Sequence, residues 1–176
     1  GKTTLLQVIT KLIGGTYERV EGTVDLMPND IIYHASISSE GKPSISKGPL
    51  LKKGEDLSIF FFNEINRARP QVHSLLLRVM AEKSVSAFNK VNYLPNMVVF
   101  ADRNQVEKNE TFELPAAARD RFMMEVSIQS PTDKVLRDSI IFDTKFQDTS
   151  KLIDNIPSAS FDCKELNEVS SEIQEN

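Results

Sequence analysis

The sequence predicts an α/β fold in which helices cover both faces of a mainly parallel sheet. Segments with helical spacing of apolar residues alternate with short apolar strands. Two of these strands, 57–62 and 97–101, are almost continuously apolar, which is typical of strands buried on both faces. The 176 residues, 40% hydrophobic and 26% charged, suffice for about one globular domain with its own core.

The first part of the chain predicts a helix, a strand and a hairpin. The helix spans 2–13, because its apolar residues recur at helical spacing and Gly14 ends it. A short strand follows at 16–20, and a brief turn or helix begins at Pro28. Residues 32–47 then form a hairpin around a Ser-Glu-Gly-Lys tip, which is rich in turn formers.

The buried strand 57–62 leads into a helix that Pro70 opens, because proline suits the first helical turn. A second hairpin is predicted at 85–93, before the strand 97–101. The remaining predictions are a short helix at 115–121, a strand at 123–128, a helix at 132–142, a polar connector at 143–160 and an acidic helix at 162–174.

Composition argues against several classes of protein. The net charge of −4 disfavours a protein that mainly binds a nucleic-acid backbone or an anionic membrane. No apolar run approaches the roughly 18–20 residues of a membrane span. The single cysteine, Cys163, excludes an internal disulfide framework, and a cytoplasmic location is the expectation. Neither His34 nor His73 has partners spaced for a metal site, so we predict surface positions for both.

The run Gly1-Lys2-Thr3-Thr4 resembles the end of a phosphate-binding loop, G-x-x-x-x-G-K-[ST], followed at once by a helix. In such a loop backbone N–H groups cradle phosphates, lysine neutralises their oxygens and the hydroxyl holds Mg²⁺. Alone, the run is more typical of an ordinary helix start with a surface lysine.

A second indication is Asn63-Glu64 at the end of the apolar strand 57–62. ATPases place two acidic residues there, one for a Mg²⁺-bound water and one to polarise the attacking water. Glu64 fits the second role, although the pair alone is equally typical of an ordinary strand-to-loop junction. Asn63 stands in the first place, where an amide can accept a hydrogen bond but carries no charge.

Asn104 and Arg121 complete the pattern. Asn104 follows the strand 97–101 and could orient the attacking water, although asparagine is also a common turn residue. Arg121 follows a short helix and could stabilise a transferring phosphoryl group, or form a surface ion pair. Because the carboxyl ends of parallel strands share one crevice, Lys2, Glu64 and Asn104 can converge on one nucleotide.

Taken together, the sequence motifs resemble those of the MoxR-type AAA+ ATPases over about residues 1 to 131. Residues 64–68 stand in the family's Asp-Glu-Ile-Asn-Arg-Ala signature, and 71–85 resemble the helix after it. Residues 24–31 are similar to its Pro-Asp-Leu-Leu-Pro-Ser-Asp-Ile segment. Asn104 matches the sensor-1 asparagine, and 111–122 match Thr-Tyr-Pro-Leu-Pro…Asp-Arg-Phe.

The resemblance implies a three-layer αβα P-loop core over 1–131, with a parallel sheet of about five strands and a helical lid that begins in 132–176. It implies that Gly1, Lys2, Thr3 and Thr4 bind ATP and that Thr3 and Asn63 hold Mg²⁺, Asn63 through water. Glu64 would be the catalytic base and Asn104 the sensor.

The resemblance also implies partners. Arg121 would act in trans on the ATP of a neighbouring subunit in a ring, usually a hexamer. The hairpins at 32–47 and 85–93 would face the pore or a client. MoxR-type proteins commonly act as chaperones, often with a von Willebrand factor A domain protein.

Three departures from the family pattern shape the expectations. The chain begins inside the Walker A motif, without the strand that feeds it, and ends inside the lid without the sensor-2 arginine; we therefore expect the isolated chain to be poorly stable. Asn63 in place of aspartate predicts a slowed ATPase. The alternative is a scaffold that binds ATP without hydrolysing it. A decayed gene copy and a nucleic-acid motor are further interpretations, the last disfavoured by the acidic balance.

Overall fold

The computed structural model describes residues 2–37, 41–103, 112–128, 132–143 and 153–157, together with Glu165, Glu168, Val169 and Glu172. A parallel sheet stands at its centre, with β4 (Leu57–Asn63) between β1 (Thr16–Glu21) and β7 (Val98–Ala101).

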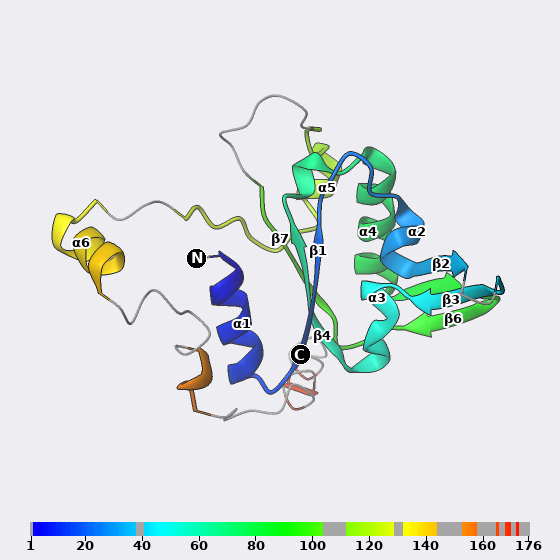
Figure 1. Ribbon diagram of the computed structural model, residues 1–176, viewed down its shortest axis with the longest axis horizontal. Coiled ribbons are helices and arrows are strands. Elements are labelled where there is room, and N and C mark those ends of the chain that lie inside the picture. The colour runs from blue at the N-terminus through cyan, green and yellow to red at the C-terminus, as the bar shows by residue number, and fades with distance from the viewer. Residues whose placement is uncertain are drawn as a thin grey trace.

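Helices cover both faces of this sheet. Figure 1 shows α1 (Lys2–Leu12) on one side, with α2 (Pro28–Ile32) and α4 (Pro70–Glu82) on the other. The predicted three-layer α/β architecture is confirmed. Because helices connect the strands, β1, β4 and β7 run in the same direction. The carboxyl ends of all three strands therefore lie at one edge of the sheet.

The centre of the core is β4, whose apolar run is buried on both faces. Phe60 and Phe62 pack into the main cluster with Val72 and Leu76 of α4. Because side chains alternate along a strand, Phe61 is buried on the opposite face, the side that α1 covers. This two-sided burial explains why the sequence of β4 shows no polar alternation.

Both predicted hairpins are confirmed. One pairs β2 (Tyr33–Ile37) with β3 (Pro43–Lys47), and the other pairs β5 (Ser84–Ala87) with β6 (Lys90–Tyr93), each antiparallel. In Figure 1 they extend from the same side of the molecule, beyond α2 and α3.

Three short elements escaped prediction: α3 (Pro49–Lys52) and the 3₁₀ turns η1 (Gly54–Asp56) and η2 (Ile65–Arg67). Each is three or four residues long, too short for a helical period to show in the sequence. The η2 turn matters for function, because it directly follows the end of β4.

The helices α5 (Ala116–Arg119) and α6 (Lys134–Phe142) confirm the predictions at 115–121 and 132–142. The strand predicted at 123–128 is wrong. No strand forms there, and Met123 is 92% exposed. A strand needs a hydrogen-bonding neighbour, and within the described residues β7 pairs only with β4.

The sheet therefore has three strands in the described part of the chain, where the resemblance implied about five. Most of the predicted connector and acidic helix lies outside the described residues. The four described positions between 165 and 172 have helical backbone. The domain division at residue 131 stays a prediction.

Candidate active site

The carboxyl ends of β4 and β7 are joined edge to edge. Ala101 of β7 lies opposite Phe62 of β4, so the next residues, Asn63 and Asp102, end the two strands side by side. The Asp102 N–H donates to the Phe62 carbonyl at 3.0 Å, and the Ile65 N–H donates to the Asp102 carbonyl at 2.9 Å. The backbone therefore fixes the turn after β4 against the end of β7.

Lys2, in the first turn of α1, reaches this same edge. Its Nζ lies 2.7 Å from Oδ2 of Asp102, whose side chain is 10% exposed. The other oxygen, Oδ1, accepts a hydrogen bond from the Glu64 N–H. One carboxylate thus connects the start of α1, the end of β7 and the residue after β4.

Glu64 adopts a left-handed backbone conformation, with φ 52° and ψ 49°. For a residue other than glycine this costs about 1–2 kcal/mol, so the surroundings must hold it. Asp102 holds this backbone on one side, and Gly22 holds it on the other. The Gly22 N–H donates to the Asn63 carbonyl at 2.7 Å, and a Cβ at Gly22 would overlap the Glu64 carbonyl. The Glu64 carboxylate accepts from Nη1 of Arg67 at 3.0 Å and is 24% exposed.

Asn63 faces the opposite neighbour. Its amide nitrogen donates to Oε1 of Glu21, the last residue of β1, and the second oxygen of Glu21 pairs with Arg19 at 2.5 Å. The amide nitrogen of Asn63 is therefore directed to β1. Its own oxygen is the group left to accept from a metal-bound water.

The other predicted site residues lie as follows. Thr3 and Thr4 are half-buried in the first turn of α1. Gly1 and Asn104 lie outside the described residues. Arg121 is exposed after α5, which Figure 1 places at the end of the sheet where β1 and β7 finish. Arg121 forms no ion pair with another described residue.

Two residues at the site were missed by sequence reasoning. Asp102 directly follows the apolar run predicted as the strand 97–101, which is the signal that could have found it. His73 was predicted on the surface and is buried instead, 3% exposed. Its Nε2 lies 2.7 Å from the Ile65 carbonyl, which can only accept, so Nε2 donates and braces the η2 turn from α4. Its place beside Val72 on the apolar side of α4 was the signal.

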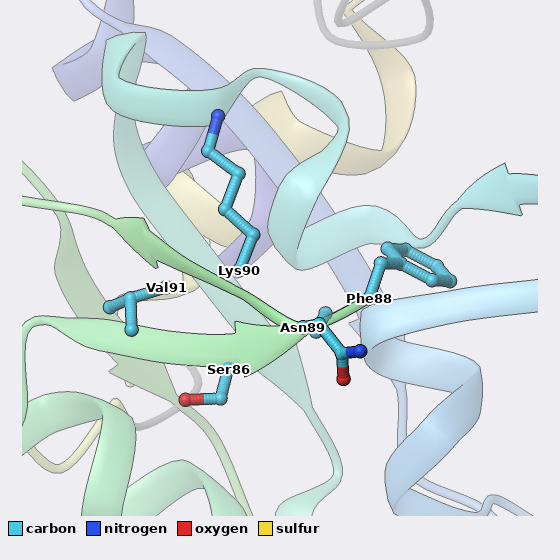
Figure 2. A pocket seen from close by; sticks show the side chains of 6 residues that line it. Ser86, Phe88, Asn89, Lys90 and Val91 are labelled. Carbon is cyan, nitrogen blue, oxygen red and sulfur yellow. The ribbon is translucent and has the colours of Figure 1, made fainter.

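A hollow of about 390 Å³ lies elsewhere, on the β5–β6 hairpin, lined by residues 86–91. Figure 2 shows its side chains spreading in different directions: Phe88, Lys90 and Ser86 do not converge on a common point. A ligand site needs convergent polar groups, so this hollow does not compete with the sheet edge as the candidate active site.

The sheet edge fits a magnesium nucleotide. Oδ2 of Asp102 is buried and lies beside the Lys2 ammonium without an aligned hydrogen bond, so it is an available acceptor in a site that also offers a cation and the Thr3 hydroxyl. The described residues contain no cluster of three or more side chains able to hold a metal without a nucleotide. Nor does any described helix have the length and apolar character to cross a membrane.

The fold defines the class of the chain: an α/β core of the P-loop type, with Lys2, Asp102 and Glu64 in contact at the carboxyl edge of its sheet. Residues 1–124 match the model of the ATPase family associated with various cellular activities (AAA). The chain therefore belongs to this AAA family, and its relatives place it with the MoxR-type members.

The chain is 56% identical to the protein MoxR of Methylorubrum extorquens and 52% identical to that of Paracoccus denitrificans, over 99% of its length in each case. It spans about half of each of these relatives, 51%. It is 32% identical, over 79% of its length, to the chaperone MoxR1 of Mycobacterium tuberculosis, of which it covers 36%. A crystal structure of an ATPase candidate from Cytophaga hutchinsonii superposes with a TM-score of 0.74 at 25% identity, covering 98% of this chain and 50% of that one.

Proposed function

We propose that the protein binds and hydrolyses MgATP as a ring-forming AAA+ ATPase and couples hydrolysis to the remodelling or maturation of partner proteins. The observation that carries this proposal is the connection, through Asp102, between the Lys2 ammonium and the backbone of Glu64. This connection places a lysine, which can bind phosphate, next to a glutamate, which can activate water.

Each residue has a role in this proposal. Gly1, Lys2, Thr3 and Thr4 bind the phosphates, and Thr3 with Asn63 holds Mg²⁺, which supplies charge neutralisation on the β- and γ-oxygens. Glu64 accepts a hydrogen bond from the attacking water and orients it. The left-handed backbone fixes the direction of this side chain, and the Arg67 contact keeps the carboxylate in place.

Two further residues act on the γ-phosphate side. Asn104, which lies outside the described residues, has the role of orienting the same water. Arg121, exposed and without an ion pair to the described residues, approaches the ATP of a neighbouring subunit and stabilises transition-state charge. A site that needs the neighbour's arginine supports a homo-oligomeric ring, for which we retain the hexamer.

The second candidate function is an ATP-binding scaffold without turnover. The contact between the Asn63 amide and Glu21 favours it, because position 63 brings no negative charge to the metal side. Loss of a charge-assisted hydrogen bond accounts for about 1–3 kcal/mol, enough to slow hydrolysis by one or two orders of magnitude.

Steady-state ATP turnover of the full-length protein tests the two functions against each other. The enzyme function predicts slow turnover that Glu64→Gln abolishes and that Asn63→Asp raises about tenfold. If the unaltered protein shows no turnover above the Glu64→Gln control while both bind ATP, the scaffold function is correct.

The hairpins are the proposed client contacts. The ring centroids of Tyr33 and Phe88 lie 5.1 Å apart, so β2 and the β5–β6 turn are held together. Ile37 and Ile45 on one hairpin and Phe88 on the other are more than half exposed. These apolar side chains fit a role in gripping a client in the cytoplasm.

A partner with a von Willebrand factor A domain remains part of the proposal, as does a division between the core at 1–131 and the lid that begins in 132–176.

A further inference from the structure

In the described part of the chain, the carboxylate that contacts the Lys2 ammonium belongs to the residue after β7 and not to the end of β4. Asp102 is also nine-tenths buried, so water screens its charge weakly. This buried acid lies one strand away from position 63.

The two positions are neighbours with opposite orientations of their side chains. The pairing of Phe62 with Ala101 puts Asn63 next to Asp102 at the edge of the sheet. The Asn63 amide donates a hydrogen bond to Glu21 on β1, whereas the Asp102 carboxylate forms an ion pair with Lys2 and accepts a hydrogen bond from the Glu64 N–H. The neutral side chain faces away from the lysine, and the charged one faces it.

We propose that Asp102 is a positioning residue of the ATP site and supplies there the negative charge that Asn63 does not. Without nucleotide, it holds Lys2 over the turn and keeps Glu64 in its left-handed conformation. With nucleotide, Lys2 moves its charge to the phosphates, and the buried carboxylate balances the magnesium that accompanies them. This inference rests on the proposed binding of ATP.

The proposal predicts a specific linkage between Asp102 and magnesium. A buried negative charge at this edge repels metal-free ATP and is compensated when Mg²⁺ is present. The protein therefore prefers MgATP over metal-free ATP, and the preference depends on the charge at position 102. A residue that only maintained the fold would alter both affinities by the same factor.

The test measures the dissociation constant of ATP for the full-length protein by calorimetry, once with excess Mg²⁺ and once with EDTA. Asp102→Asn keeps the shape of the side chain and removes its charge, and should lower the preference for MgATP about tenfold. The double variant Asn63→Asp with Asp102→Asn returns a carboxylate to the same edge and should recover most of that preference. Glu82→Gln, an exposed acid on α4, is the matched control and should change nothing.

Each outcome decides the matter. An unchanged preference in Asp102→Asn, or equal weakening with and without Mg²⁺, overturns the inference and leaves ATP binding in place. Failure of the double variant to recover the preference when Asp102→Asn has lost it shows that a carboxylate at position 63 cannot replace Asp102, and overturns the claim that Asp102 supplies the charge that Asn63 does not. If the unaltered protein binds no ATP in either buffer, the proposed function falls and the inference falls with it.

Discussion

The ends of β4 and β7 differ in charge. The sequence pattern leads one to expect an acidic residue at the end of β4, whereas the structure has it at the end of β7. At the end of β4, position 63 carries a neutral amide that bonds to Glu21. At the end of β7, Asp102 carries a buried carboxylate that contacts Lys2. The carboxyl ends of neighbouring parallel strands lie at the same edge of the sheet. The comparison therefore teaches that either strand can supply the charged residue of a site at that edge.

The two strands also differ in how fully they are enclosed. Both read in the sequence as continuous apolar runs, yet all residues from 57 to 62 are buried, whereas Val98 of β7 is 53% exposed. Within the described residues β4 has a strand on either side and β7 has one. Both apolar runs form strands, but only β4, which has a neighbour on either side, is fully buried.

The largest expected effect is a difference in stability between truncating a side chain of β4 and truncating one of β7. Phe62→Ala should lower the free energy of unfolding of the full-length protein by about 3–5 kcal/mol, because the residue is fully buried between β4 and α4. Val98→Ala should cost below about 1 kcal/mol. Urea unfolding measures both. A loss at Val98 as large as that at Phe62 would show that β7 is enclosed as fully as β4.

A smaller effect is expected on β1, the other neighbour of β4. The Tyr17 hydroxyl is buried and has no hydrogen-bond partner within the described residues, and burial raises the pKa of Tyr17 above its usual 10.0. Tyr17→Phe removes an unsatisfied polar group and should raise the free energy of unfolding by about 1 kcal/mol at pH 8. A clear loss of stability would show that the hydroxyl does have a partner in the full-length protein.

The raised pKa of Tyr17 also fixes a pH dependence. Its stabilising contribution is fully present below pH 10, the unfolded value, and is lost as pH rises through the higher folded value. The unaltered protein should therefore lose more stability between pH 9 and pH 11 than Tyr17→Phe does. Burial lowers the pKa of Lys83, which works in the opposite direction, but both proteins retain Lys83, so the difference between them isolates Tyr17.

The smallest expected effect lies at the end of β4. Glu21→Gln removes the charge that Asn63 contacts, but the Glu21 side chain is 50% exposed and paired with Arg19. Stability should change by less than about 0.5 kcal/mol, and ATP affinity should stay unchanged. A change in ATP affinity as large as that of Asp102→Asn would remove the distinction between the two strand ends.

Much of this architecture was predictable because it depends on local patterns. The helices at 2–13 and from Pro70, the buried strand at 57–62 and both hairpins follow from periodicity and turn residues. The strand at 123–128 was not predictable in the same way, because a strand depends on a partner elsewhere in the chain.

The site was predictable in its components and not in its connections. The motifs named Lys2 and Glu64, and the structure brings Lys2 to the backbone of Glu64 through a residue that no motif contains. Asp102 acts through the register of β4 and β7, and His73 through the packing of α4 on the η2 turn. Neither relation is a spacing along the chain. Asn104 lies outside the described residues, and its role stays a prediction.

The most direct test of the central claim is equilibrium binding of MgATP to the full-length protein, measured by calorimetry beside its Lys2→Ala variant. If the carboxyl edge of the sheet is a nucleotide site, the unaltered protein binds, and Lys2→Ala weakens binding at least tenfold, because the lysine charge neutralises phosphate oxygens. Equal affinity in the two proteins, or no binding by either, would contradict the claim that Lys2, Asp102 and Glu64 form an ATP site.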